Sequence, residues 1–368
     1  MALVNSIDPD HARQRLEPWL AARLGVPAVT VTDVVVPRAS GVSNETVLLD
    51  AAWEQDGDVR RRSLVVRVAP PAGTGVTPTT YDLGTELAVL RALRGSAVPV
   101  PEALWHEPDA DLLGGPFLVL ERLPGRTLAD DPPFTVSGWI HELDPVRRRT
   151  LDDAALGALV AVHATDPARL ADVPGLLRTV EERIALYEAF YARVAGAQRV
   201  PAIEAGFAWL REHRPDEPAE PGVSWGDARP GNLLLTDDGA VAGVLDWEMV
   251  GLGAPELDLG WWLFFLRHHT EGIGAPLPEG LRDRDATIAR YEELAGRAVD
   301  REAVAFHEAF AGLRAAVMMV RAAQLMTDAG LLPPDNGMAS NNLMLQLFCA
   351  LAGMPAPDGD GVHFIGNR

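Results

Sequence analysis

The sequence predicts an α+β protein of two lobes, in which an antiparallel sheet is followed by a mostly helical part. The first third holds three segments with the alternation typical of strands, separated by turn residues: 29–36, 47–53 and 64–69. Most of the remainder has helical spacing, in segments 147–163, 176–195, 203–213, 257–268, 284–295, 301–326 and 338–350. A chain of 368 residues with 48% hydrophobic composition can form two lobes. We expect the N-terminal lobe over residues 1–123 and the C-terminal lobe over residues 124–368.

A short helix is expected before the first strand. Asp8 and Pro9 have the character of an N-cap and a first-turn residue, and leucines recur every four residues as far as Leu24. Gly25 then ends the pattern. After the third strand, residues 81–93 have an apolar helical stripe, and residues 117–120 are typical of a buried strand.

An acidic residue lies on the apolar stripe of helix 81–93, and an arginine lies within the third strand. Glu86 falls among the leucines of that stripe, and Arg67 falls among valines. An acid on an apolar face is costly unless a cation pairs with it. We therefore predict a strand-to-helix ion pair between Arg67 and Glu86. The alternative is a partly exposed surface pair.

The strongest functional signal lies in residues 224–248. Asp227 is followed five residues later by Asn232, then by an apolar run, a turn at 236–239 and a second run that leads to Asp246. This pattern predicts a hairpin that brings Asn232 and Asp246 to the same end of two paired strands, as a bridging metal requires. In kinase-type phosphoryl transfer one Asp accepts the proton of the attacking hydroxyl, while an Asn and a second Asp hold magnesium. We predict these roles for Asp227, Asn232 and Asp246; the alternative is that they only form turns.

Arg229 follows the predicted base by two residues, where protein kinases place a lysine near the transferring phosphate. We expect it to neutralise charge on the γ-phosphate, and the alternative is a solvated loop residue. The chain contains no lysine, so all 32 basic residues of the Lys and Arg count are arginines. A Walker-A phosphate loop, which requires lysine, is therefore excluded.

Other nucleotide contacts are expected in the first lobe. In the loop 38–46, Ser43 and Asn44 lie among small residues that would let backbone amides approach phosphates, although an ordinary hairpin loop has similar composition. Main-chain groups of Glu121 to Leu123 would recognise the purine, although a strand that ends in a Pro-Gly turn predicts the same sequence. Arg67, oriented by Glu86, would hold the α- and β-phosphates.

The segment after Asp246 bears on the type of acceptor. The chain passes almost directly through residues 251–258 into the next helix, which leaves no room for the activation segment that holds a protein substrate. A small-molecule hydroxyl is the expected acceptor, and helices within residues 176–213 could wall off its pocket. Asp258 is expected to accept backbone amides of the loop around Asp227, or else to cap its own helix.

The bulk composition narrows the class of protein. A formal net charge of −20 disfavours nucleic acid and anionic lipid as partners, and the longest aromatic-aliphatic run, residues 261–266, is too short to span a membrane. Cys349 is the single cysteine, and the N-terminus lacks the basic start and apolar core of a secretion signal. We expect a cytoplasmic location, and the sequence gives no signal for oligomeric state.

These motifs resemble the aminoglycoside phosphotransferase family of kinase-like small-molecule phosphotransferases, and above all the subgroup related to the kinase domain of some acyl-CoA dehydrogenase fusions. The resemblance extends from residues 43–46 through 64–70 to 245–248 and 253–258. It implies a protein-kinase-like two-lobed fold, ATP with Mg²⁺ as cofactors (GTP being possible), and phosphorylation of a small-molecule hydroxyl. Two residues depart from the family pattern: Trp225 stands where a histidine is common, and Arg67 where a lysine is common. The alternatives are a catalytically silent nucleotide-binding regulatory protein and an antibiotic-resistance kinase.

Overall fold

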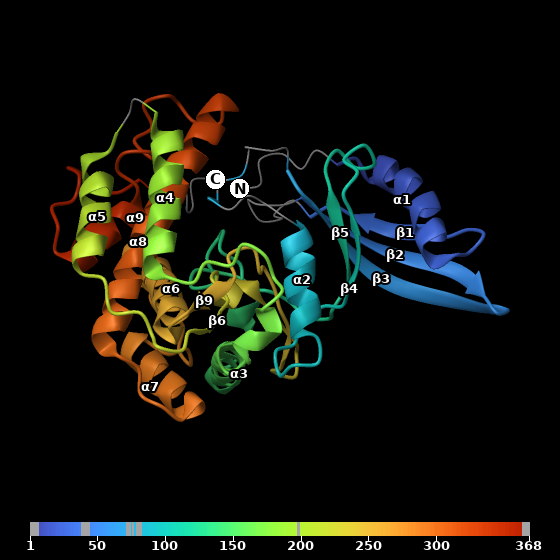
Figure 1. Cartoon of the computed structure of the whole chain (residues 1–368), viewed down its shortest axis with the longest axis horizontal. Coiled ribbons are helices and arrows are strands. Elements are labelled where there is room, and N and C mark those ends of the chain that lie inside the picture. Colours follow the sequence, from blue (N-terminus) through green and yellow to red (C-terminus); the bar gives the residue numbers. More distant parts are fainter. Residues whose placement is uncertain are drawn as a thin grey trace. The chain divides into compact units, whose positions relative to one another are not determined.

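The structure is a computed structural model that describes residues 7–37, 45–70, 75, 77–78, 83–196 and 199–362. The chain forms two compact units (Figure 1). The first comprises Met1–Arg94 and Val100–Leu123, and the second comprises Gly95–Pro99 and Pro124–Arg368. The predicted phosphate-loop residues Ser43 and Asn44 lie outside the described residues.

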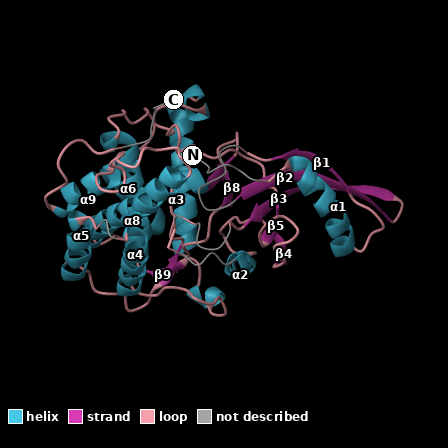
Figure 2. Cartoon of the chain, turned by 90° about the horizontal axis from the view of Figure 1, so that it is seen from above, coloured by secondary structure: helices cyan, strands magenta, loops and turns pink. Residues whose placement is uncertain are grey.

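The first unit is built on a five-stranded antiparallel sheet in the order β1-β2-β3-β5-β4. Helix α1 lies over this sheet in Figure 2, and its residues Ala12, Leu16 and Leu20 pack into a core with the strands. The elements are α1 (Pro9–Leu24), β1 (Thr30–Val35), β2 (Glu45–Gln55), β3 (Asp58–Val68), α2 (Leu83–Leu93), β4 (Ala103–Glu107) and β5 (Phe117–Glu121). As predicted, Asp8 caps α1 and Gly25 ends it in a left-handed conformation.

The two-residue period in the second half of β3 separates its core residues from Arg67. Leu64, Val66 and Val68 pack into the core shared with α1, so Val65 and Arg67 point to the other face of the sheet. On that face the Arg67 side chain reaches Glu86 in α2. The alternation of the strand therefore determines which helix the arginine meets.

The second unit is mostly helical and has α8 at its centre. Helices α4, α5, α6 and α9 all contact α8 and surround it in Figure 1. The helices are α3 (Pro145–His163), α4 (Val180–Ala195), α5 (Pro201–Glu212), α6 (Pro255–Arg267), α7 (Arg284–Ala295), α8 (Arg301–Asp328) and α9 (Leu343–Ala352), with short turns at Trp139–Glu142, Pro167–Leu170, Pro230–Asn232 and His268–Gly272. By length and composition α8 could span a membrane, but 89% of its most apolar window is buried inside the protein, as expected of a core helix.

Two small antiparallel sheets lie among these helices. Strands β7 (Leu233–Leu235) and β8 (Val241–Val244) form the predicted hairpin, and β6 (Gly222–Ser224) pairs with β9 (Gly251–Gly253). Pairing of β6 with β9 fixes both ends of the segment 224–251. Every residue of the predicted motif, residues 224–248, lies inside one compact unit.

The α+β fold, with its antiparallel sheet and helical C-terminal part, is confirmed, but several element bounds differ from prediction. Strands β2 and β3 extend farther toward their shared turn than expected, because polar residues continue the ladder where no apolar alternation marks it. Helix α4 begins four residues later than expected, at a capping box of Thr179 and Glu182. Strand β4, which shows no clear alternation, had not been predicted.

Candidate active site

Residues 224–232, here called the Asp227 loop, connect β6 to the hairpin. The β7–β8 register pairs Leu233 with Val244, and the Leu245 amide donates to the carbonyl of Asn232 at 2.9 Å. Asn232 and Asp246 therefore flank the same end of the hairpin, as predicted. Asp246 has a φ of 59°, a left-handed backbone that carbonyl side chains tolerate better than most. The local turn thus directs the chain out of β8 at this residue.

The Asp227 carboxylate is nearly buried, at 9% exposure, and is held by three side chains. Its Oδ1 accepts from the indole of Trp261 at 2.7 Å, and its Oδ2 accepts from the amide nitrogen of Asn232 at 2.6 Å. The Nε of Arg229 donates to both oxygens, at 3.0 and 3.2 Å. These donors fix the orientation of the carboxylate.

Arg229 is partly buried and paired, and is not the solvated loop residue of the alternative interpretation. Its side chain is 19% exposed and forms ion pairs with both Asp227 and Asp130. Burial alone would lower its pKa, but the charges of these two carboxylates outweigh burial and raise the pKa above its usual value. The guanidinium also lies 5.8 Å from the ring centre of Phe265. A permanent cation is therefore present beside the Asp227 carboxylate.

Asp258, fully buried at the start of α6, holds the Asp227 loop as predicted. Its Oδ1 accepts from the Ser224 hydroxyl at 3.0 Å and the Gly226 amide at 2.8 Å. Its Oδ2 accepts from the Trp225 amide at 2.6 Å and from Nε2 of His163 at 3.0 Å. Burial would raise the pKa of Asp258, but the hydrogen bond and charge of His163, together with the loop amides, lower it overall. His163 thus helps to hold the carboxylate of Asp258 in place.

The loop approaches the segment after the hairpin too closely for any side chain at position 226. A Cβ on Gly226, whose φ is 91°, would lie 2.0 Å from the carbonyl oxygen of Met249. A glycine is therefore required here, both for the left-handed backbone and for the contact. The Trp225 indole donates at 2.8 and 3.2 Å to the carbonyls of Leu245 and Asp246, and so ties the loop to the end of the hairpin.

Sequence reasoning missed three side chains that contact the Asp227 region. Trp261 donates to Asp227 from α6, Asp130 pairs with Arg229 from a distant loop, and Arg314 of α8 lies behind Trp261. The guanidinium of Arg314 is 4.0 Å from the Trp261 ring centre, and its side chain is buried. A Trp-Trp pair inside an apolar helix and a single Arg in another carry no periodic signal that links them to the loop.

The predicted ion pair of the first unit is present. Arg67 and Glu86 form a charge-assisted hydrogen bond, with side chains 14% and 4% exposed, so the surface-pair alternative is wrong. Glu121 ends β5, and its amide donates to the carbonyl of Glu102 at 3.0 Å. Leu123 closes the first unit two residues later. Glu86 thus provides a buried anion that fixes the Arg67 guanidinium.

The donor set at the hairpin end is suited to a magnesium ion. The Asn232 amide nitrogen faces Asp227, donating to both its side chain and its carbonyl, and this orientation leaves Oδ1 of Asn232 for a cation. Oxygen donors from one amide and one carboxylate are what Mg²⁺ takes when phosphates and water supply its other ligands. Within the described ranges, no cluster of three or more His, Cys, Asp or Glu side chains offers a separate metal site.

The sequence profile of the phosphotransferase enzyme family matches residues 34–315, more than three quarters of the chain. The chain belongs to this family. The matched part of this phosphotransferase-family chain includes the Arg67–Glu86 pair, the Asp227 loop and the hairpin.

Solved structures support the same fold. A candidate aminoglycoside phosphotransferase from Ralstonia eutropha aligns with a TM-score of 0.65 and 22% identity over 92% of this chain and 98% of its own. A thermostable mutant of aminoglycoside phosphotransferase APH(4)-Ia, crystallised with ADP and hygromycin B, aligns with a TM-score of 0.58 and 17% identity over the same shares. At such identities the likeness establishes the fold alone.

Curated relatives are much longer proteins. Mouse acyl-CoA dehydrogenase family member 10 is 31% identical over 229 residues, which cover 61% of this chain and 20% of the relative. Human acyl-CoA dehydrogenase family member 11 is 26% identical over 268 residues, which cover 72% of this chain and 32% of the relative. The phosphotransferase-family chain therefore spans a fifth to a third of the length of these relatives.

Proposed function

We propose that this phosphotransferase transfers the γ-phosphoryl group of ATP to a hydroxyl group of a small molecule, with Mg²⁺ as the metal. The main support is the arrangement around Asp227, a buried carboxylate oriented by Trp261, Asn232 and Arg229 next to a hairpin that carries two oxygen ligands. The family membership supports a phosphotransferase. ADP, AMP-PNP and GDP are the nucleotides bound in several structural relatives, so GTP is an alternative donor.

In the proposed reaction Asp227 takes the proton of the acceptor hydroxyl. The acceptor oxygen forms a bond to the γ-phosphorus as the bond to the β,γ-bridging oxygen breaks, and ADP leaves with that electron pair. The Arg229 contact is the longest of the three to Asp227 and is shared between two oxygens, so it is the one most readily exchanged for an acceptor hydroxyl. From there the guanidinium can neutralise charge that develops on the phosphoryl group.

Several residues are proposed to bind the nucleotide and its metal. Arg67, oriented by buried Glu86, would hold the α- and β-phosphates, and main-chain groups of Glu121 and Leu123 would contact the purine. The loop that contains Ser43 and Asn44 is proposed to bring backbone amides to the phosphates. Asn232 and Asp246 would bind Mg²⁺, which when bound neutralises charge on the phosphate oxygens. We also propose a cytoplasmic protein whose acceptor is a small molecule.

A small molecule, and not a protein, is proposed as the acceptor for two reasons. Only eight residues separate Asp246 from the start of α6 at Pro255, too few for a segment that would hold a protein substrate. A structural relative was crystallised with the small molecule hygromycin B. The catalytically silent alternative requires a site without a base, and the buried Asp227 argues against it.

The test compares Asp227→Asn with Asp237→Asn, the same isosteric change at an exposed turn residue of the hairpin that follows the Asp227 loop. Both proteins are incubated with γ-labelled ATP, Mg²⁺ and a fractionated metabolite extract, and transferred label is counted. Asp227→Asn should lower transfer by roughly 10²–10⁴ because the amide cannot accept the proton. Asp237→Asn should transfer label at the wild-type rate. Nucleotide affinity, measured by calorimetry, should be alike in all three proteins, and undiminished transfer by Asp227→Asn would exclude it as the base.

A further inference from the structure

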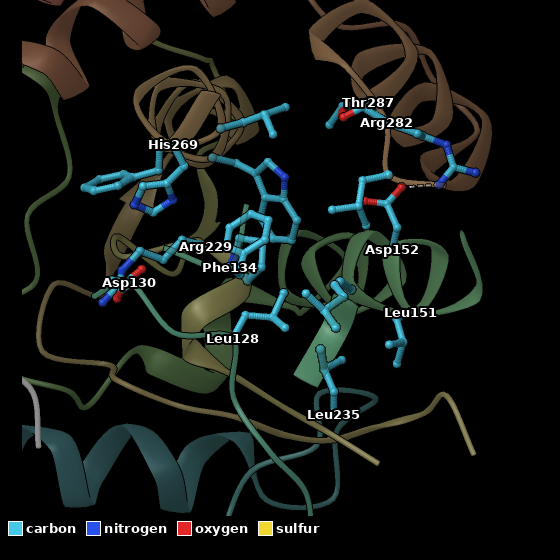
Figure 3. Close-up of a pocket in the computed structure, with 17 residues that line it drawn as sticks. Leu128, Asp130, Phe134, Leu151, Asp152, Arg229, Leu235, His269, Arg282 and Thr287 are labelled. Atoms are coloured by element: carbon cyan, nitrogen blue, oxygen red, sulfur yellow. Dashed lines mark hydrogen bonds and ion pairs between the residues drawn. The ribbon is translucent and has the colours of Figure 1, made fainter. Parts of the chain in front are cut away.

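A cavity lies inside the second unit between α3, α6 and the segment that precedes α7 (Figure 3). Arg229 and Asp130 lie together on one side of it in Figure 3, and Arg282 and Asp152 lie together on the other. All 17 lining residues belong to the same compact unit. Although α4 and α5 were expected to wall off a pocket, they contribute none of the described lining residues, because they pack against α8 and α9.

The wall between these two ion pairs is apolar. Eleven of the 17 lining residues are aliphatic, aromatic or proline, among them Leu128, Phe134, Leu151, Ala155 and Phe265. The free volume is about 30 Å³, which admits a narrow aliphatic group but no bulky ring system unless the walls move. An apolar surface of this kind favours carbon groups over hydrated ones.

The polar lining groups are neutralised by one another. Asp130 pairs with Arg229, and Asp152 pairs with Arg282, whose other nitrogen donates to Asp153 at 2.7 Å. Burial, with a smaller contribution from the charge of Arg229, lowers the pKa of His269 to about 4, so this imidazole is neutral near pH 7. An ammonium group entering the cavity would find both lining carboxylates, Asp130 and Asp152, already paired with an arginine, and would have to compete with a guanidinium for either of them.

The side chain of Arg229 connects the cavity to the proposed base. Arg229 lines the cavity and also donates to both oxygens of Asp227, and Pro230 of the same loop lines the cavity as well. A molecule whose hydroxyl reaches Asp227 can therefore extend its neighbouring carbon atoms past Arg229 toward the apolar walls.

From this juxtaposition we infer that the cavity receives the carbon skeleton of the acceptor, and that the acceptor is an alcohol with an uncharged aliphatic part next to its reacting hydroxyl. This inference rests on the proposed phosphotransfer. It distinguishes the acceptor from a polycationic amino sugar, whose ammonium groups would find no carboxylate without an arginine partner among the described lining residues.

The test measures binding to the full chain in the presence of ADP and Mg²⁺. Linear primary alcohols from propanol to octanol, and the amino sugar neamine, are titrated by saturation-transfer NMR and thermal shift. Each added methylene should tighten alcohol binding about fourfold until the cavity is filled. Neamine should not bind the cavity. Failure of every alcohol to bind, or tighter binding of neamine than of the best alcohol, overturns the inference.

Two variants locate the binding. Ala155→Leu fills the cavity and should weaken alcohol binding by roughly tenfold or more, whereas Ala154→Leu, at a partly exposed position of the same helix, should not. Leu281→Ala enlarges the cavity and should shift the preference to longer alcohols, which tests the site even if Ala155→Leu does not fold. Unchanged affinity and chain-length preference in both cavity variants would overturn the inference. The thermal shifts also report whether the wild-type chain is stabilised by nucleotide. Alcohol binding without stabilisation by nucleotide would count against the proposed function alone. Stabilisation by nucleotide without alcohol binding would count against the cavity inference alone.

Discussion

Replacing Asp258 by asparagine is the sharpest test of how the Asp227 loop is held. The change keeps the size of the side chain, so it leaves no cavity. The carboxylate accepts four hydrogen bonds, from Ser224, Trp225, Gly226 and His163. An asparagine offers one oxygen in place of two, and its amide group then faces donors instead of accepting from them.

The expected magnitude follows from that count. Two of the four bonds lose their acceptor, and a hydrogen bond to a charged group contributes roughly 1.5–3 kcal/mol, so Asp258→Asn should lower the free energy of unfolding by about 3–6 kcal/mol. Asp283→Asn is the control, because Asp283 caps α7 at an exposed site where asparagine caps equally well. Urea denaturation followed by far-ultraviolet circular dichroism measures both.

The difference between wild type and Asp258→Asn should also depend on pH. Because the folded-state pKa of Asp258 is below the ordinary value of 3.8, its contribution is complete above that value and is lost as pH falls through the folded-state pKa. The two proteins should converge in acid and differ most near neutrality. A difference of less than about 1 kcal/mol at neutral pH, equal to that of the control, would refute the account of the loop.

Three further outcomes are expected. Arg67→Ala and Glu86→Ala should each raise the nucleotide dissociation constant measured by calorimetry. The double variant should bind nucleotide as tightly as the weaker-binding single variant, because Glu86 acts only through Arg67. Additive losses of binding free energy would contradict this. Mg²⁺-ATP at 100 times its dissociation constant should stabilise the chain by about 2.7 kcal/mol, and Asp246→Ala should remove the metal-dependent part of the shift in melting temperature. The pKa of His269 is about 4 in the folded protein and 6.5 ordinarily, so the unfolded chain binds the proton first and the free energy of unfolding should fall by roughly 3 kcal/mol as pH is lowered from 6.5 to 4. His269→Gln should lack this part of the pH dependence. Equal pH slopes in the two proteins would show that the imidazole is not buried as described.

The residues predicted best from the sequence are those whose partners lie on one short segment or on an obvious stripe. Asn232 and Asp246 are joined by a hairpin whose two apolar runs and turn are visible in the sequence, so their common position followed from strand pairing. Glu86 was identifiable because an acid on an apolar helix face requires a cation, and Arg67 was the odd charge among valines.

The side chains that were missed meet the loop from elements far away in sequence. Trp261 and Asp227 are 34 positions apart, and Asp130 and Arg229 are 99 apart, so neither contact leaves a periodic trace. Only the packing of α6 on the loop brings the Trp261 indole to the carboxylate. The absence of residues 176–213 from the described lining of the cavity has a related reason: helical spacing shows that a helix is amphipathic, but it does not show which neighbour its apolar face will meet.

Two tryptophans give this site its own optical reporters. The Trp261 indole donates to the Asp227 carboxylate, and the Trp225 indole donates to the carbonyl of Asp246, so one fluorophore lies at each of the two groups on which the proposed chemistry depends. Indole emission responds to nearby charge, and nucleotide arrival or proton transfer should therefore change it without an attached dye. With nine tryptophans in the chain, difference spectra of Trp225→Phe and Trp261→Phe would assign the change. The tryptophan that replaces the family's common histidine thus makes the loop observable on the millisecond timescale of stopped-flow mixing.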